Sequence, residues 1–238
     1  MENTKAFDIY KDFEKRKAMT KEEMLSKLNE WAKSGKYEKD MLVANWKPQK
    51  TACEVITNYY NPDRDEIRII DVASGTGLVG MELLKLGFRN VDALDPSEEM
   101  MKVAKERKIY QNHFTEYFDG TRLACIETDT YDAAFVVGGF SVGYMPTNAL
   151  FELIRIAKIG GLLILSVWEG FDEMIDEYRD RFFPLTQKME KNGELTLLRE
   201  DVIPKPDKEP NGLRLVYRVH VSESSFSHLK ALQNCNEF

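Results

Sequence analysis

The stretch that most constrains the fold of this chain is the fourteen-residue run Ile67–Gly80. A short apolar segment leads into Asp71, a tight turn with Gly75 and Gly77 follows, and a helical pattern begins at Leu78. Glycines let the backbone turn sharply and approach a ligand where a β-carbon would clash. The new helix directs its unpaired N–H groups into the same space. This order predicts a nucleotide-binding turn at the end of a buried strand.

The rest of the central region alternates between strand and helix patterns, which favours a parallel sheet covered on both faces. Residues 162–168 form a continuous apolar run, as expected for a strand buried on both sides. Residues 213–221 alternate apolar and polar side chains, so this last strand is predicted to be half-exposed and antiparallel to its predecessor, 194–203. We therefore predict an α/β, Rossmann-like sheet of seven mostly parallel strands with an antiparallel last strand and helices on both faces. The other predicted strands are 67–70, 91–94, 110–118 and 131–137, and the predicted core helices are 78–86, 97–104, 147–158 and 172–191, the last interrupted by Pro184.

Residues 1–45 have a charged, helical pattern, and residues 1–60 are predicted to form a helical flap within the same domain as the core, residues 61–221. Thr20 and Glu23 have the spacing of a capping box, which predicts a helix from here to about Trp31. A second predicted helix begins near Pro48, a residue that suits the first helical turn. The Ser-rich segment 222–238 is predicted to be a flexible tail.

Composition narrows the class of protein. The formal charge is −7, from 33 basic and 40 acidic side chains, which argues against a broad nucleic-acid-binding face. Cys53, Cys125 and Cys235 form no Cys-x-x-Cys pair, so neither a disulfide framework nor a zinc site is expected. The sequence shows no segment with the pattern of a membrane span or a secretory signal. We therefore expect a monomer in the cytoplasm or nucleus, without membrane association.

The glycine spacing by itself fits a dinucleotide. Gly75, Gly77 and Gly80 match the dinucleotide fingerprint, and Asp95 stands twenty residues after Gly75, where that fingerprint has its ribose-binding acid. In that pattern, however, the strand leads almost directly into the first glycine, whereas Asp71 and three further residues intervene here. An acid at this entrance repels a pyrophosphate but suits a ligand with an ammonium group, such as S-adenosylmethionine. Asp95 can still bind a ribose, because its two oxygens can accept both hydroxyls.

Several landmarks of one enzyme family occur here in that family's order. They are the run Asp71–Val79, then Ala93-Leu-Asp95 with Ser97 and Met100, then Tyr131-Asp132, and then Lys158 before Gly160-Gly161. In these residues the chain resembles the class I S-adenosylmethionine-dependent methyltransferases. Further likeness around Trp31 and Tyr37, in 135–141 and in 215–217 extends the resemblance over most of residues 30–220. The resemblance implies a Rossmann-like fold and S-adenosylmethionine as cofactor.

The resemblance also implies a role for each matching residue. Asp95 would bind the ribose, and Gly138 would offer backbone contacts beside the sulfonium methyl group. Asp71, Ala73, Gly75 and Gly77 would border the methionine end, Ser97 and Met100 would border the adenine, and Ser74, Pro96, Trp31 and Tyr37 complete the predicted site. For Trp31 and Tyr37 the alternative role is packing within the flap.

Two positions depart from the family pattern. Ala73 stands where the family usually has glycine, so the backbone approaches a ligand less closely there. Many relatives carry an acid after the third strand that holds the adenine amino group, and Glu116 and Thr115 are the candidates in this chain. Neither position alters the class that the other landmarks indicate.

No catalytic residue or metal ligand is assigned from the sequence. Methyl transfer from a sulfonium needs alignment and exclusion of water, and a general base only where the acceptor must lose a proton. The motifs for methylating amino groups on bases and for cytosine chemistry are missing, so a small-molecule or protein acceptor is expected ahead of nucleic acid. Two other hypotheses stay open: a cofactor-binding protein without transferase activity that acts through a partner, and a nicotinamide-dependent oxidoreductase.

Overall fold

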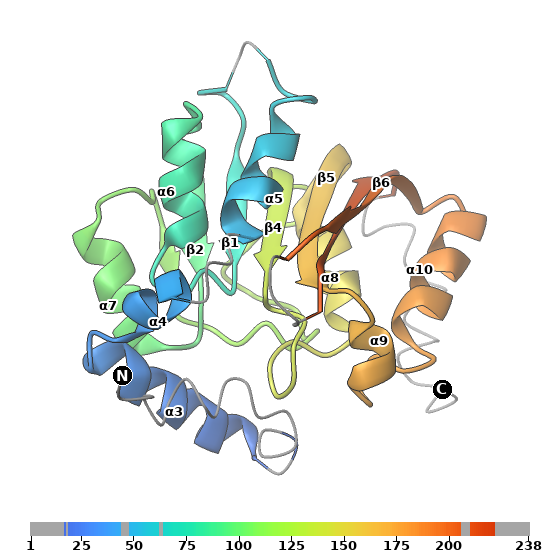
Figure 1. Cartoon of the computed structure of the whole chain (residues 1–238). Coiled ribbons are helices and arrows are strands. Elements are labelled where there is room, and N and C mark those ends of the chain that lie inside the picture. Colours follow the sequence, from blue (N-terminus) through green and yellow to red (C-terminus); the bar gives the residue numbers. More distant parts are fainter. Residues whose placement is uncertain (1–16, 18, 44–47, 62–63, 206–209, 222–238) are drawn as a thin grey trace.

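The computed structural model describes residues 17, 19–43, 48–61, 64–205 and 210–221, and its centre is a seven-stranded sheet. The strand order is β3-β2-β1-β4-β5-β7-β6. Neighbouring strands are parallel except in the pairs β5–β7 and β6–β7, so β7 runs against the others. The predicted mostly parallel sheet with an antiparallel last strand is confirmed (Figure 1). The strands are β1 (Ile69–Val72), β2 (Val91–Leu94), β3 (His113–Phe114), β4 (Tyr131–Val137), β5 (Ala157–Trp168), β6 (Leu195–Ile203) and β7 (Gly212–Val219).

Helices cover both faces of the sheet. On one face, α5, α6 and α7 pack on the strands around an apolar core that includes Ile56, Leu83 and Met101. On the other face, α8, α9 and α10 close a larger core that includes Leu150 and Phe171. The described helices are α3 (Lys21–Lys33), α4 (Tyr37–Val43), α5 (Pro48–Ile56), α6 (Leu78–Lys85), α7 (Glu98–Glu106), α8 (Ala149–Ile156), α9 (Phe171–Met174) and α10 (Phe182–Lys191).

Local signals set several helix ends as predicted. Thr20 and Glu23 form the complete capping box at the start of α3. Ser97 caps α7, because its hydroxyl accepts a hydrogen bond from the Met100 N–H at 3.1 Å. Such a cap satisfies one of the N–H groups that a helix start leaves without a partner.

The prediction of a half-exposed last strand is wrong. β7 lies between β5 and β6, and residues 212–217 are buried. The alternation that suggested an exposed face includes Arg214, whose side chain is itself buried, 2.7 Å from Asp201 on the neighbouring β6. The position of the strand within the sheet, which its own pattern does not encode, decides its burial.

Other element bounds differ from the predicted ones. Residues 172–191 form two helices, and Pro184 lies in the first turn of α10, where no intrahelical N–H bond is lost. The third strand is only His113–Phe114, and α8 ends at Ile156 because β5 begins at the next residue. α4 was not predicted.

Within the described residues, the predicted flap consists of α3 and α4, which lie beyond the ends of β1 and β2 at the lower left of Figure 1.

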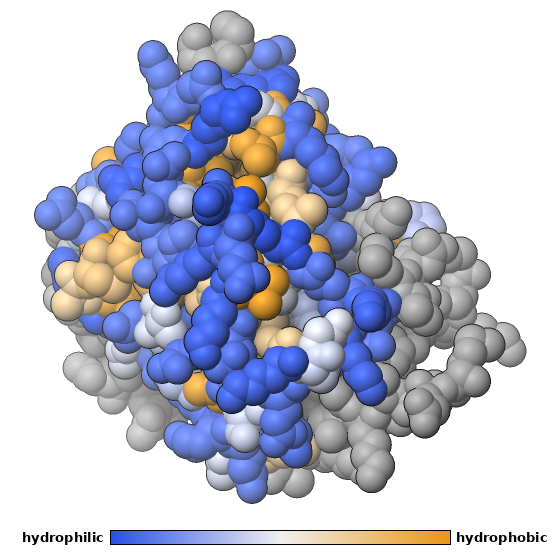
Figure 2. Space-filling view, turned by 90° about the vertical axis from the view of Figure 1, so that its left-hand side faces the viewer, coloured by the Kyte–Doolittle hydropathy of each residue, from blue (hydrophilic) through white to orange (hydrophobic). Residues whose placement is uncertain are grey.

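The face that carries α6 and α7 is mainly hydrophilic, with apolar side chains in separate patches (Figure 2). None of the helices in the described ranges is long and apolar enough to cross a membrane. The segment 222–238, predicted to be a tail, lies outside the described residues, and the proposed division of the chain stays a prediction.

Candidate cofactor-binding site

A cavity lies at the carboxyl ends of β1, β2 and β4, with α3 over it. It measures about 920 Å³ with its open mouth included, which suits a small-molecule ligand. Ligands of open parallel sheets bind at the carboxyl ends of the strands, at the point where the strand order reverses. In this sheet the reversal lies between β1 and β4. Of the twelve predicted cofactor residues, seven line the cavity: Tyr37, Ala73, Gly75, Asp95, Pro96, Met100 and Gly138.

The glycine turn joins the end of β1 to the start of α6. Gly77 has a φ of +94° and occupies the N-cap position of α6. The turn is closed by a hydrogen bond of 2.9 Å from the Gly77 N–H to the Ser74 carbonyl. Ala73 has a φ of +58°, a conformation that costs an L-residue roughly 1–2 kcal/mol. The backbone therefore keeps the left-handed conformation that glycine would adopt freely at this position.

Asp95 joins the turn to α7. Its Oδ2 atom accepts a hydrogen bond of 2.9 Å from the Gly75 N–H, and its Oδ1 atom accepts one of 2.8 Å from the Ser97 N–H. Burial raises the pKa of the Asp95 carboxyl to about 6, although these two hydrogen bonds favour the ionised form. Each carboxylate oxygen has a second lone pair. Asp95 can therefore hold the turn and still accept hydrogen bonds from a ligand in the cavity.

Asp71 lies beneath the turn and does not line the cavity. Its Oδ2 atom accepts a hydrogen bond of 2.6 Å from the Tyr110 hydroxyl, and its Oδ1 atom has no hydrogen-bond partner among the described residues. Burial raises the pKa of Asp71 to about 7, against the effect of the Tyr110 hydrogen bond and with a contribution from the charge of Asp95. The ammonium-binding role of Asp71 stays a prediction.

Four more predicted residues lie outside the cavity wall: Ser74, Gly77, Ser97 and Trp31. Ser74 is buried in the turn between β1 and α6, and Ser97 is buried in the turn between β2 and α7. Trp31 is 3% exposed, and its Nε1–H donates a hydrogen bond of 2.8 Å to Asp40. Its ring meets that of Tyr37 edge-on at 4.8 Å. These contacts fit packing of Trp31 against Tyr37, which does reach the cavity, and a ligand contact for Trp31 stays a prediction.

α3 covers the cavity and is fastened to α7. The Asn29 Oδ1 atom accepts hydrogen bonds from the Ser97 hydroxyl at 2.7 Å and from the Glu99 N–H at 3.3 Å. Lys33 forms an ion pair with Glu99 at 3.6 Å. Met24 of α3, which is 4% exposed, lies over Gly143 in the segment after β4. α3 therefore lies over the site with apolar side chains along the cavity, and polar contacts hold it to α7.

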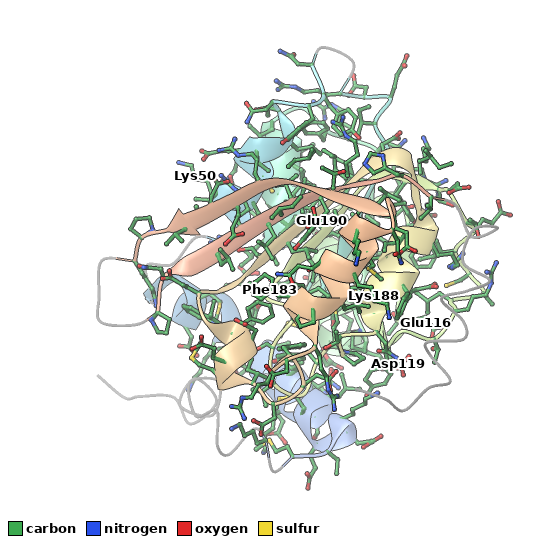
Figure 3. All side chains as sticks on the ribbon, turned by 90° about the vertical axis from the view of Figure 1, so that its right-hand side faces the viewer. Lys50, Glu116, Asp119, Phe183, Lys188 and Glu190 are labelled. Carbon is green, nitrogen blue, oxygen red and sulfur yellow. The ribbon has the colours of Figure 1, made fainter. Side chains whose placement is uncertain are left out.

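Asp119 is the main residue that sequence reasoning missed. It follows β3 by five residues and lines the cavity with Tyr117 and Phe118, whereas the two candidates Thr115 and Glu116 are exposed. Figure 3 shows Asp119 and Glu116 at the same edge of the molecule. Burial raises the pKa of Asp119, but hydrogen bonds from Thr121 and the charge of Lys21 outweigh it, so the pKa lies below its usual range. The Asp-Gly pair after a strand is the signal that could have found it.

Comparisons with known proteins find methyltransferases among the proteins that this chain resembles. Residues 70–165 match the family described as "Methyltransferase domain". Human methyltransferase-like protein 27 is 29% identical over 157 residues, which cover 66% of this chain and 62% of that protein. The demethylmenaquinone methyltransferase of Renibacterium salmoninarum is 28% identical over 169 residues, which cover 68% of this chain and 69% of that protein. These matches support a methyltransferase domain of the class I S-adenosylmethionine-dependent kind in this chain.

Solved structures share the fold of this chain. A Haloferax volcanii chain solved in complex with a methyltransferase activator has a TM-score of 0.58 and 20% identity, over 82% of this chain and 98% of that chain. An S-adenosylmethionine-dependent methyltransferase from Aquifex aeolicus has a TM-score of 0.51 and 20% identity, over 71% of this chain and 91% of that chain. The alignment with the human relative spans less than two thirds of that protein's length.

The residues of this cavity fit S-adenosylmethionine, the cofactor of the class I methyltransferases that the chain resembles. Gly138 has a φ of +78°, and the space where its β-carbon would lie is empty to 4 Å, so the backbone is open to a ligand there. Asp95 supplies acceptor oxygens in the same cavity, next to the apolar side chain of Met100. A polar cradle beside an apolar wall suits a ribose and an adenine ring. In the described part of the chain, no group of His, Cys, Asp and Glu side chains could hold a metal ion.

Proposed function

We propose that this methyltransferase moves the methyl group of S-adenosylmethionine to a small molecule whose body is uncharged and largely apolar. The observation that carries the proposal is the single cavity in which Asp95, the open backbone at Gly138 and the apolar side of α3 meet. When bound, the cofactor supplies an activated methyl group. The residues of the chain then have to position, desolvate and orient the reactants.

Each part of the wall has a proposed task. Asp95 accepts hydrogen bonds from the ribose hydroxyls, and the Gly75 backbone and Tyr37 border the amino acid end. Asp119 accepts a hydrogen bond from the adenine amino group, a role supported by its place on the cavity wall and its ionised state. Met100 provides an apolar surface for the ring. Asp119, which lies on the wall but was not predicted, thus completes the proposed cofactor site.

The acceptor side is proposed to lie between α3 and the segment after β4. Met24 and Leu25 of α3 line the cavity together with Tyr144 and Met145 of that segment. Lys21, a cation on this wall, forms an ion pair with Asp119 at 3.4 Å. Among the relatives are demethylmenaquinone methyltransferases and ribosomal protein L11 methyltransferases. The apolar side chains of α3 along the cavity favour the first kind of acceptor, a small apolar molecule, over a protein side chain.

Calorimetric titration with S-adenosylhomocysteine tests the cofactor part of the proposal. We expect saturable binding at one site, while NADH produces no heat. Binding of NADH without binding of S-adenosylhomocysteine would favour the oxidoreductase hypothesis instead. The titration measures binding alone, so its result does not depend on knowing the acceptor.

A methyl-labelled cofactor assay tests the transfer itself. The protein is incubated with labelled cofactor and, separately, with fractionated apolar metabolites, polar metabolites and proteins. We expect label in the apolar metabolite fraction and production of S-adenosylhomocysteine. Binding without turnover on every fraction would favour the cofactor-binding protein that acts through a partner.

We also propose that the protein is a monomer located in the cytoplasm or nucleus. Light scattering measures its oligomeric state, and cell fractionation shows its location.

A further inference from the structure

One face of α8 is polar although two of its residues, Glu152 and Arg155, lie inside the protein; the face continues to the exposed N-cap residue Asn148. Asn148, Glu152 and Arg155 are spaced four and three residues apart, so their side chains project from the same face of the helix. Glu152 is 4% exposed and Arg155 is 5% exposed. This face meets the connection between β3 and β4, residues 115–130, while the rest of α8 packs into the apolar core.

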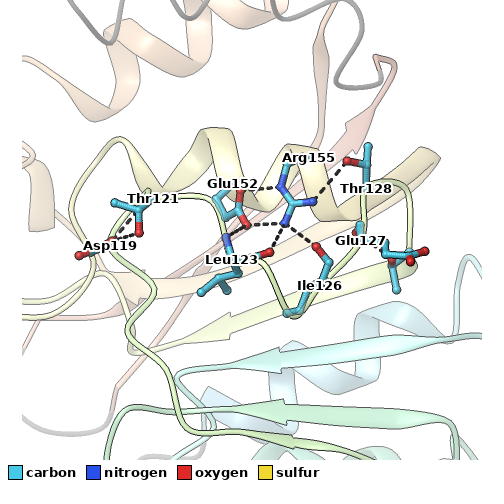
Figure 4. A network of polar contacts seen from close by, with 9 residues as sticks. Asp119, Thr121, Leu123, Ile126, Glu127, Thr128, Glu152 and Arg155 are labelled. Atoms are coloured by element: carbon cyan, nitrogen blue, oxygen red, sulfur yellow. Dashed lines mark hydrogen bonds and ion pairs between the residues drawn. The ribbon is translucent and has the colours of Figure 1, made fainter.

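Glu152 and Arg155 bind the backbone of this connection at several points (Figure 4). Glu152 Oε1 accepts a hydrogen bond of 2.9 Å from the Leu123 N–H. Arg155 Nη2 donates to the carbonyls of Ile126 at 2.9 Å and Leu123 at 3.3 Å, and Nη1 donates to the Thr128 hydroxyl at 3.3 Å. The two side chains also pair with each other, with Nε 2.7 Å from Glu152 Oε2. The planar guanidinium can contact all these acceptors at once because its five donors form a rigid fork.

The other end of the connection reaches the cavity. Asp119 Oδ1 accepts hydrogen bonds from the Thr121 N–H at 3.1 Å and from the Thr121 hydroxyl at 2.8 Å. Between them, Gly120 lies so close to the N-terminus of α8 that a β-carbon would come within 2.6 Å of the Asn148 side chain. α8 therefore contacts the connection beside Asp119 and again along residues 123–128.

A need for stability alone does not explain this arrangement. A buried ion pair is often no more stabilising than apolar side chains of the same volume, because removing two charges from water is costly. Apolar side chains, however, could not bind the N–H and carbonyl groups of Leu123 or fix the path of an irregular backbone. An unsatisfied buried backbone group is itself unfavourable, so the network permits only conformations that keep its bonds.

We propose that Glu152 and Arg155 are positioning residues for cofactor binding: they set the path of residues 119–128 and thereby place Asp119 on the adenine side of the cavity. This inference rests on the proposed function, in which Asp119 receives the adenine amino group. The pair acts from a distance through the backbone of the connection and touches no ligand. Discrimination of adenine from other bases is then a property that α8 controls.

The test compares two ligands that differ at the adenine amino group. S-adenosylhomocysteine carries the amino group, and S-inosylhomocysteine carries a carbonyl oxygen that would face the Asp119 carboxylate. We expect the wild-type protein to prefer the first by about tenfold or more, since a site built for a donor rejects an analogue without it. In Arg155→Lys, which keeps the charge but loses the fork, we expect this preference to fall to about threefold or less. Calorimetry gives both dissociation constants.

A matched control separates positioning from general stability. Asp201→Asn weakens the ion pair between Asp201 and Arg214 in β6 and β7, away from the cavity wall. We expect this control to lower the melting temperature and leave the preference for adenine unchanged. If Arg155→Lys does not fold, Thr128→Val removes one acceptor of the same guanidinium, and a partial fall of the preference is expected.

Hydrogen exchange supplies a readout without ligand. We expect the amides of Leu123 and Ile126 to exchange faster in Arg155→Lys than in the wild type, and to be unchanged in Asp201→Asn. A folded Arg155→Lys protein with the wild-type preference would overturn the positioning role. A wild-type protein that binds both ligands equally would also overturn it while leaving cofactor binding intact. Failure to bind either ligand would instead reject the proposed function.

Discussion

The Tyr110 hydroxyl donates a hydrogen bond of 2.6 Å to the Asp71 carboxylate beneath the glycine turn. The same hydroxyl accepts a hydrogen bond of 3.2 Å from the Gly80 N–H. The ring lies so close to α6 that a β-carbon at Gly80 would come within 2.5 Å of it. One side chain thus connects the strand and the helix on either side of the turn, which explains why glycine stands at position 80.

Tyr110→Phe is expected to lower the free energy of unfolding by about 1–3 kcal/mol, because a buried carboxylate loses its donor. Urea denaturation followed by circular dichroism measures the change. Tyr117→Phe is the matched control, since Tyr117 is 39% exposed, and its effect should stay within about 0.5 kcal/mol. Equal stabilities of the two variants would show that the Tyr110 hydroxyl contributes nothing to the fold.

Stability of the ligand-free protein should depend on pH through two buried acids. Burial raises the pKa of Asp71 to about 7 and that of Asp95 to about 6, whereas an unfolded aspartate titrates near a pKa of about 3.9. Between these values the native state holds protons that the unfolded state has lost. The free energy of unfolding therefore falls as pH rises from about 4 to about 7. Urea denaturation across this range should show a smaller fall in Asp71→Asn, and identical slopes would contradict the assignment.

Asp95→Ala is expected to weaken binding of S-adenosylhomocysteine by roughly 1–3 kcal/mol through the loss of charge-assisted hydrogen bonds. It should also lower stability, because Gly75 and Ser97 lose their common acceptor. Asp132→Asn is the control: it weakens the ion pair with Lys158 at 2.9 Å at the amino-terminal ends of β4 and β5, away from the cavity, so stability should fall without a change in affinity. Calorimetry on folded variants measures the affinity for S-adenosylhomocysteine. An unchanged affinity in Asp95→Ala would rule out ribose binding by Asp95.

Asn29→Ala should loosen the flap, because the hydrogen bonds to Ser97 and Glu99 are lost. We expect S-adenosylhomocysteine to dissociate several-fold faster, as gating by a lid would require. Stopped-flow displacement measures the dissociation rate. Lys27→Ala serves as the control, since the ion pair of Lys27 with Glu30 at 3.1 Å is exposed. If both variants release the ligand at the wild-type rate, α3 does not gate the site.

Residues whose roles follow from local geometry could be predicted. The turn at Gly75 and Gly77, the cap at Ser97 and the acid at Asp95 all follow from the chemistry of a few adjacent residues. Asp119 was missed because β3 is only two residues long, and so short a strand gives a weak pattern. The residue that follows such a strand cannot be placed until the sheet is known.

The sequence by itself determined the parallel α/β fold and the position of the glycine turn, because these depend on periodicity and on backbone preferences of neighbouring residues. The acid before the turn and the resemblance to a known family indicated the class of cofactor. Only the tertiary structure decided that Asp71 lies beneath the turn, since its partner Tyr110 is 39 residues away. It likewise decided that β7 is buried and that α8 carries a polar face against residues 115–130. These features depend on which elements pack together, and a burial pattern within one segment does not specify its neighbours.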